Sequence, residues 1–242
     1  MASDEEEIRR GWLSAARAWT ADVTPRMMAP FRQARVVPDP VFVLSAQGVW
    51  VERVTADVTP GIMGALRTGW RSITRRPPGP SFDQGQYVRD YLTQSVNRMS
   101  NTPDQVYREI TDQIAQGVAA GESVPELAAR VQTAMVVAGN PWWENRAVVV
   151  ARTEAQAAIN AGSLAGAGQQ EIDTGRPMLK TWQATVSQPE RTRPAHFKAD
   201  AQEVPLRQPF LVGGEQLQFP GDPSGSASNV IQCRCDMTFR QA

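Results

Sequence analysis

The change from helix signals to strand signals near residue 173 constrains the fold of this chain more than any other feature. Upstream of it, apolar residues recur at helical spacing. Downstream of it, short runs of alternating polar and apolar residues are separated by proline and glycine. The pattern predicts an α+β protein, with a mostly helical N-terminal two-thirds followed by a small antiparallel β-rich C-terminal domain.

Several helix starts are marked by a capping residue, by proline in the first turn, or by both. The last long helix, which begins at Pro141, is expected to run to about Gln169. A half-buried strand is expected after it, in which Leu179 and Thr181 alternate with Lys180 and Trp182. Residues 229–239 are expected to form the closing strand. The marked helix starts are Ser3 with Glu6, Asp39 with Pro40, Thr102 with Pro103, Ser123 with Glu126, and Asn140 with Pro141.

A proline-rich segment divides the helical part of the chain. Residues 77–81 contain three prolines, which stiffen a linker. We therefore predict an N-terminal helical segment at 1–76 that binds a partner, the linker at 77–81, a helical middle region at 82–172, and the β-rich domain at 173–242.

Charge and hydropathy restrict the partners. The 25 basic and 25 acidic residues cancel, so the whole-chain field attracts neither nucleic acid nor membrane strongly. No apolar run approaches the roughly 20 residues of a membrane span, and the acidic start is unlike a signal peptide. We expect a protein made in a cytosol, with no membrane contact. One local exception is a basic cluster that suits DNA or an acidic protein surface, although it is also typical of a solvated helix face: Arg67, Arg71, Arg75 and Arg76.

The groups best suited to neutral-pH chemistry are concentrated in the last fifth of the chain. His196 is the only histidine, and Cys233 and Cys235 are the only cysteines. A single histidine excludes zinc sites and metal-dependent nucleases that need two. Three interpretations remain. The three residues bind a structural zinc with Asp200, Asp222 or Asp236 as a fourth ligand, they form a cysteine- or zinc-dependent hydrolase or nuclease site, or they fill a core.

The spacing of the two cysteines bears on these alternatives. On a strand, Cys233 and Cys235 share one face and are poorly placed for a mutual disulfide, so we expect reduced thiols. Structural zinc more often uses Cys-x-x-Cys. Arg234, between them, is expected to lower a thiol pKa. The chain shows no glycine-rich phosphate loop, and Gly162, Gly166 and Gly168 favour close helix packing.

Two residues of the last long helix are candidates for tying it to the β-rich domain. Arg152 and Glu154 are close enough in sequence to act together as a buried pair that contacts the tail, or else they occupy an exposed face.

In their order and spacing, the segments from Arg152 in the last long helix to Cys235 resemble the C-terminal domain of the Mu F-like minor head proteins of tailed phages. These proteins are also called phage head morphogenesis or minor capsid proteins. The resemblance covers about residues 85–242 and is most specific over 150–236. Gln188 and Gln232 depart from it, where aspartate and asparagine are more usual. The matching positions are Arg152, Glu154, Trp182, Arg193, His196, Pro220, Gly221, Asp222, Cys233, Arg234 and Cys235.

The resemblance implies a virion protein of the capsid interior, associated with the portal. It implies roles in head morphogenesis and in DNA packaging or ejection, with the portal protein, capsid or scaffold proteins, packaged DNA and further copies of itself as partners. It implies no established enzyme activity, assembly in the host cytoplasm, and the portal as the candidate partner of the 1–76 segment. From the residues themselves we expect no cofactor, or else a structural zinc at His196, Cys233 and Cys235. The alternative is a small hydrolase or nuclease that uses His196, Cys233 and Cys235.

Overall fold

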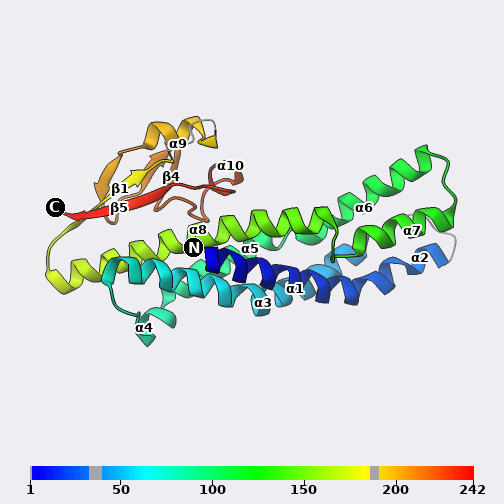
Figure 1. Cartoon of the computed structure of the whole chain (residues 1–242), viewed down its shortest axis with the longest axis horizontal. Helices are drawn as coiled ribbons and strands as arrows, with labels where there is room; N and C mark the ends of the chain where they lie inside the picture. The colour runs from blue at the N-terminus through cyan, green and yellow to red at the C-terminus, as the bar shows by residue number, and fades with distance from the viewer. Residues whose placement is uncertain (1, 33–39, 186–190) are drawn as a thin grey trace. The chain divides into compact units, whose positions relative to one another are not determined.

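A computed structural model describes residues 2–32, 40–185 and 191–242. Helices occupy most of the chain up to residue 174, and the strands follow (Figure 1). The α+β prediction is therefore confirmed. The helices of this part are α1 (Ala2–Met27), α2 (Ala29–Arg32), α3 (Pro40–Thr74), α4 (Pro80–Asp83), α5 (Gln86–Met99), α6 (Thr102–Ala119), α7 (Val124–Met135) and α8 (Pro141–Thr174).

The C-terminal part has short elements joined by turns. A three-stranded antiparallel sheet has the order β2-β1-β5, and β3 and β4 form a separate antiparallel pair. The elements are β1 (Met178–Gln183), α9 (Pro194–Ala199), β2 (Glu203–Pro205), β3 (Phe210–Val212), β4 (Glu215–Leu217), α10 (Ala227–Val230) and β5 (Asp236–Gln241).

Four of the five predicted helix starts agree with the structure to within about a residue, whereas Ser3, expected to cap the first helix, lies inside α1, which begins at Ala2. Ser123 caps α7 by donating its backbone N–H to Glu126 over 2.7 Å, and Asn140 accepts the N–H of Trp142 over 3.0 Å. Pro40 begins α3 as expected, while Asp39 lies outside the described residues.

Three element boundaries differ from the predicted ones. α6 is capped by Asn101, so Thr102 belongs to the helix. α8 continues past Gln169 to Thr174, because residues 170–174 include neither glycine nor proline. The closing strand begins at Asp236 instead of residue 229, because Ser226 starts the short helix α10 and Asn229 lies inside it.

The chain packs as two compact units. The C-terminal unit comprises residues 1–8, 60–95 and 149–242, and the helical unit comprises 9–59 and 96–148. Each unit combines segments that are distant in sequence. The four-segment division stays a prediction, and the chain between α3 and α4 spans residues 75–79.

Tryptophans form the core of the helical unit. Trp12 packs against Trp50 and Trp143 with ring centroids 5.7 and 5.8 Å apart, and Trp19 packs against Trp50. The indole N–H of Trp50 donates to the carbonyl of Met99 over 2.7 Å. Burying large rings while their N–H groups find acceptors fixes the helices around them.

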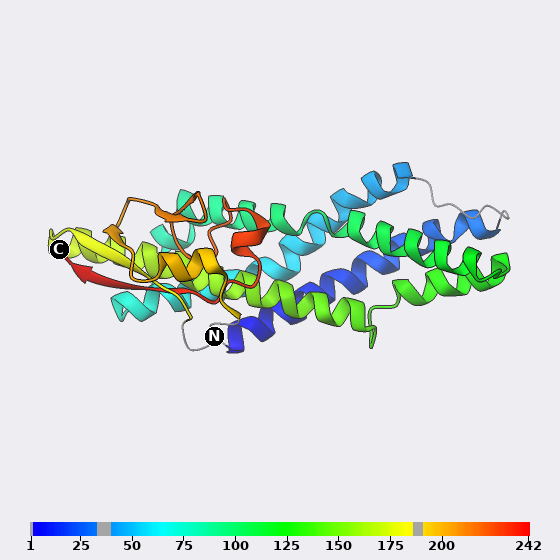
Figure 2. The ribbon, with the colours of Figure 1, turned by 90° about the horizontal axis from the view of Figure 1, so that it is seen from above.

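In the C-terminal unit, helices α3 and α8 approach closely. A Cβ added at Gly162 would lie 2.0 Å from the carbonyl oxygen of Leu66, and one at Gly69 would lie 2.0 Å from that of Ile159. The predicted packing role of Gly162 is thus visible in the structure, whereas Gly168 has a wider clearance. Figures 1 and 2 show the strands, α9 and α10 lying along the second half of α8.

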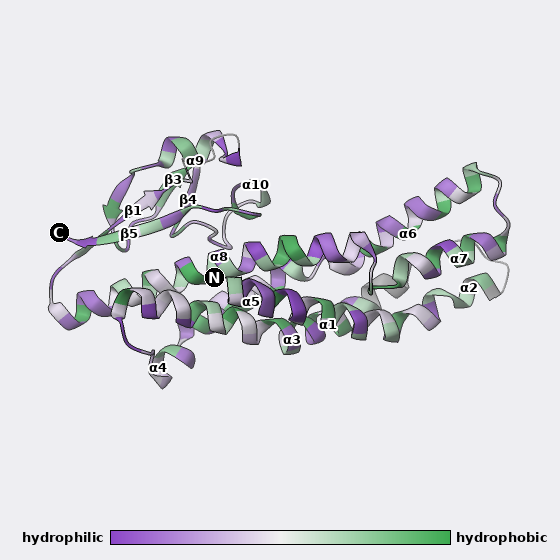
Figure 3. Cartoon of the chain, in the orientation of Figure 1, coloured by the Kyte–Doolittle hydropathy of each residue, from purple (hydrophilic) through white to green (hydrophobic). Residues whose placement is uncertain are grey.

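Hydrophilic and hydrophobic residues lie side by side along the long helices (Figure 3). Among the described residues, none of the helices has the length and apolar character needed to cross a membrane.

Candidate functional site

The structure brings His196, Cys233 and Cys235 together. The Nδ1 atom of His196 lies 3.3 Å from the Sγ atom of Cys235 and 3.6 Å from that of Cys233. All three potential ligand atoms lie within 4.8 Å of one another. The three residues are buried, at 2% exposure or less. The cluster expected from sequence is therefore a single interior site.

Two neighbouring elements position these side chains. α9 presents His196, whose ring packs edge-on against Trp182 of β1 at 5.5 Å between centroids. The cysteines precede β5 instead of lying on it, yet both point inward while Arg234 between them is exposed. Their shared orientation was predicted correctly, but their place on a strand was wrong. Gln232, with φ of 55°, makes the turn that leads into this segment.

Asn229 orients the imidazole of His196. Its Oδ1 atom lies 3.3 Å from the Nε2 atom of His196, while its amide nitrogen donates to the carbonyl of Val212 over 3.4 Å. Because the amide oxygen faces the ring, Nε2 carries the proton and Nδ1 presents a lone pair to both sulfur atoms. The ring is thus set up to accept a thiol hydrogen or to bind a metal through Nδ1.

A polar stripe on α8 holds the cysteine segment in place. Asn160 donates its amide hydrogens to the carbonyls of Pro220 and Cys235 over 2.9 and 3.0 Å. Gln156 also donates to the carbonyl of Cys235, and the Thr153 hydroxyl accepts the N–H of Gln232 over 3.0 Å. We did not predict these residues from sequence, although polar side chains at spacings of three and four on an otherwise apolar helix indicate such a face.

The predicted pair on α8 lies beside this stripe. Glu154 is buried, whereas Arg152 is half-buried. The hydrogen bonds that carry the contact between α8 and the tail, among those described above, come from Thr153, Gln156 and Asn160.

Hydrogen bonding and charge shift the pKa values of the two thiols in opposite directions. The hydrogen bond with Cys235 lowers the pKa of Cys233, and the nearby Arg193 lowers it further. The same bond, together with burial, raises the pKa of Cys235. The arginine that lowers the pKa of Cys233 is therefore Arg193, which also donates to the carbonyl of Ile231, and not the exposed Arg234.

The three aspartates proposed as a fourth ligand have other partners. Asp200 accepts the N–H of Ala184 over 2.8 Å, and Asp236 accepts that of Met237. Asp222 accepts the N–H groups of Gln218 and Ser224 and so shapes the turn after Gly221. Among the described His, Cys, Asp and Glu residues, the group that could hold a metal ion consists of His196, Cys233 and Cys235.

The signature turn at 220–222 packs directly on α8. Gly221 has φ of 86°, and a Cβ there would lie 2.9 Å from the Cβ of Ala157. Glycine is needed here because the backbone is left-handed and the helix leaves no room for a side chain.

Lys180 is a buried charge that we did not predict from sequence. It faces inward from β1, and its Nζ atom donates to the carbonyl and side-chain oxygens of Gln218 over 2.7 and 3.2 Å. The ammonium lies 4.9 Å from the ring centroid of Phe210. Burial lowers the pKa of Lys180 to about 8, although the attraction of Asp222 opposes the shift.

The four arginines of the basic cluster are not equally available. Arg67 makes a bidentate pair with Asp83 at 3.1 and 2.8 Å, and Arg76 pairs with Asp173. Arg71 and Arg75 are exposed. Half of the cluster is therefore neutralised by nearby carboxylates.

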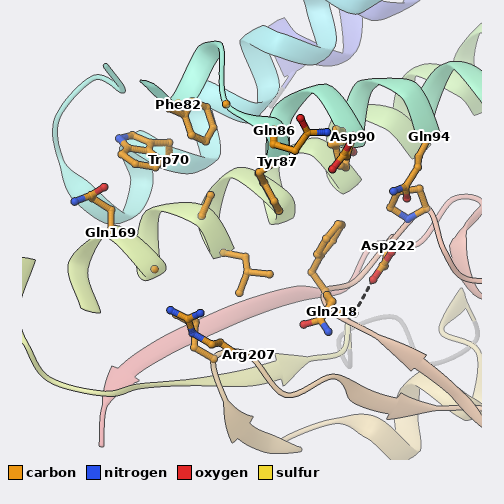
Figure 4. A pocket seen from close by; sticks show the side chains of 18 of the residues that line it. Trp70, Phe82, Gln86, Tyr87, Asp90, Gln94, Gln169, Arg207, Gln218 and Asp222 are labelled. Atoms are coloured by element: carbon orange, nitrogen blue, oxygen red, sulfur yellow. Dashed lines mark hydrogen bonds between the residues drawn. The ribbon is translucent and has the colours of Figure 1, made fainter. Parts of the chain in front are cut away.

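A cavity of about 870 Å³ lies in the C-terminal unit between α5, α8 and the turns after β2 and β4. In Figure 4, Tyr87 and Asp90 of α5 face Gln218 and Asp222 across it, with Arg207 at its border. None of His196, Cys233 or Cys235 lines this cavity. The cluster and the cavity are therefore separate features.

The family model of the phage Mu protein F like proteins matches residues 108–238, more than half of the chain. The chain belongs to this Mu F-like family. The matched region contains Arg152, the α8 stripe, the signature turn and the whole His–Cys cluster. It begins later than the resemblance seen in the sequence, which covers about residues 85–242. No curated protein and no solved structure matches the chain.

Proposed function

We propose that this Mu F-like phage head morphogenesis protein is a minor head protein of a tailed phage or prophage. In this role it is a virion component of the capsid interior, attached to the portal, and it acts in head assembly and in DNA packaging or ejection. The observation that carries the proposal is the family match over residues 108–238. The portal protein is the main partner, with capsid or scaffold proteins, packaged DNA and further copies of the chain as others.

The construction of the C-terminal unit supports a structural role. Residues of the matched region hold the fold together: Asn160 binds the cysteine segment, Gly221 packs on α8, and Asp222 closes a turn. A protein that works by assembly needs such a rigid module and a surface for its partners. It needs no open reaction centre.

The alternative is a hydrolase or nuclease built on His196, Cys233 and Cys235. A nucleophile or catalytic metal must meet its substrate, and a catalytic zinc keeps an open position for water or substrate. The three side chains are at most 2% exposed and lie outside the cavity of the C-terminal unit. Their burial favours a structural use of the cluster, so we propose that the protein is not an enzyme.

Portal binding is tested by co-expressing the full chain with the portal protein of the same phage or prophage and isolating the complex by size-exclusion chromatography. We expect co-elution, with the mass of the complex giving the copy number. The double variant Arg71→Glu/Arg75→Glu tests whether the exposed arginines of the predicted partner-binding segment contribute. Its matched control is Arg108→Glu/Arg176→Glu, which makes the same charge change at exposed positions outside that segment.

Two results would contradict the proposal. One is separate elution of chain and portal at every salt concentration, together with normal heads from a phage that lacks the gene. The other is turnover of nucleic acid or ester substrates that His196→Ala abolishes while the circular dichroism spectrum is unchanged.

A further inference from the structure

We infer that His196, Cys233 and Cys235 bind one Zn²⁺ ion that ties the cysteine segment to α9. Zinc binds thiolate sulfur at about 2.3 Å and imidazole nitrogen at about 2.0 Å. At the tetrahedral angle, these bond lengths separate nitrogen from sulfur by about 3.5 Å. The observed separations of 3.3 and 3.6 Å between Nδ1 and the two sulfur atoms match this edge.

The orientation of the ring supports the same conclusion. A histidine that ligates a metal usually donates its other ring N–H to an oxygen acceptor, which fixes the tautomer. In this chain Asn229 supplies that acceptor at 3.3 Å from Nε2. Asn229 is itself held by its bond to Val212, so the lone pair of Nδ1 is directed at the sulfur pair.

The backbone of the cysteine segment is fixed before any ion binds. The carbonyl of Cys235 accepts from Asn160 and Gln156 of α8, and the N–H of Gln232 donates to Thr153. A Cys-x-Cys pair is unusual for zinc, but here the turn at Gln232, with φ of 55°, places both sulfur atoms on one side. The tertiary structure thus removes the objection that the spacing raises.

Charge and ligand type select the ion. Two thiolates and one Zn²⁺ ion sum to zero, which suits a site where every ligand residue is at most 2% exposed. Soft sulfur ligands combined with imidazole favour zinc over magnesium or calcium. The three protein ligands leave one tetrahedral position for a buried water molecule. Burial of the ligands makes the ion structural, because no substrate reaches that position. The inference does not depend on the portal role proposed above.

The composition of the chain makes the test specific. Since it contains one histidine and two cysteines, every thiolate–metal signal comes from this site, provided that no histidine tag is used. We expect elemental analysis of the purified full chain to give one zinc per chain. The variants Cys233→Ser, Cys235→Ser and His196→Ala should each lose it. The matched control is Phe197→Ala, on the same helix but exposed, which should keep it.

A second measurement covers the case in which the variants fail to fold. Wild-type protein stripped with a chelator and titrated with Co²⁺ should develop a sulfur-to-cobalt charge-transfer band that saturates at one equivalent. X-ray absorption of the zinc form should show two sulfur neighbours and one imidazole. Both cysteines should resist alkylation until the chelator is added.

The inference is overturned if wild-type protein refolded with Zn²⁺ holds no stoichiometric metal and Co²⁺ gives no charge-transfer band. It is also overturned if folded Cys235→Ser and His196→Ala retain the zinc of the wild type, because the ion then binds elsewhere. A portal-binding chain without zinc would remove this inference alone, and a zinc-binding chain without portal affinity would remove only the proposed function.

Discussion

At the scale of single residues, buried polar groups of the C-terminal unit pair with specific partners from distant segments. Asn160 serves two carbonyls from separate segments, and Lys180 serves two oxygen atoms of Gln218. An unmatched polar group in such a place costs about 1–3 kcal/mol. These pairings therefore specify how the tail lies on α8.

Lys180 makes the stability of the protein depend on pH in a defined direction. Its pKa is lowered to about 8 in the folded protein from 10.5. Between these values the unfolded chain binds a proton that the folded chain lacks, so the stability associated with this group rises as the pH increases from 8 to 10.5 and is lost as it falls.

We therefore expect the unfolding free energy of the wild type relative to Lys180→Met to increase by roughly 3 kcal/mol across this range. Urea unfolding at a series of pH values measures the difference, and titrations common to both proteins cancel. Lys198→Met, at the exposed second lysine, should show no such trend. A difference for Lys180→Met that stays flat between pH 8 and 10.5 would show that the ammonium is not destabilised by burial.

At the scale of elements, the contact between α3 and α8 depends on the absence of side chains. Glycines at 69 and 162 let the backbone of each helix touch the other within the C-terminal unit. Such an approach leaves no rotamer by which an added carbon atom escapes, because the obstacle is a backbone carbonyl.

Gly162→Ala should consequently destabilise the protein by about 3 kcal/mol or more, at the upper end of overpacking effects. The control is Gly48→Ala in α3, where no atom lies within 4 Å of the added Cβ. There the higher helix propensity of alanine should stabilise by up to about 1 kcal/mol. Thermal and urea unfolding of both variants test the contrast, and equal stabilities would contradict the close contact.

At the scale of the whole molecule, the question is what the chain's charge lets it bind. The net charge is zero, and Arg67 and Arg76 are engaged with Asp83 and Asp173. The net charge therefore supplies no long-range attraction to DNA, and within the basic cluster a contact would rest on the exposed Arg71 and Arg75.

DNA binding through the basic cluster should accordingly involve about two phosphates, giving a log–log salt slope near 2 instead of near 4. Fluorescence anisotropy with a labelled duplex between low and moderate salt measures this slope. Arg71→Gln/Arg75→Gln should abolish the salt dependence, whereas Arg26→Gln/Arg108→Gln should leave it unchanged. A slope near 4 in the wild type would mean that DNA displaces the two aspartates.

Much of the fold was accessible from sequence because its signals are local. Caps such as Ser123 and Asn140 act within a single helical turn, and alternation in β1 acts between neighbours, so both are legible without knowledge of distant residues. The boundary error at Thr102 arose where two adjacent polar residues, Asn101 and Thr102, could both cap the helix. The error at residue 229 arose because the short helix α10 precedes the strand.

The sequence by itself thus determined the α+β order of elements and the confinement of histidine and cysteine to the tail. It also carried the family membership, which the family match confirms. Only the tertiary structure decided that Nδ1 of His196 lies 3.3 and 3.6 Å from the two sulfur atoms. It also decided that Lys180 is buried and that Arg67 is neutralised. The physical reason is that these properties depend on partners from distant segments, such as Asn229 for His196 and Gln218 for Lys180, which no local pattern specifies.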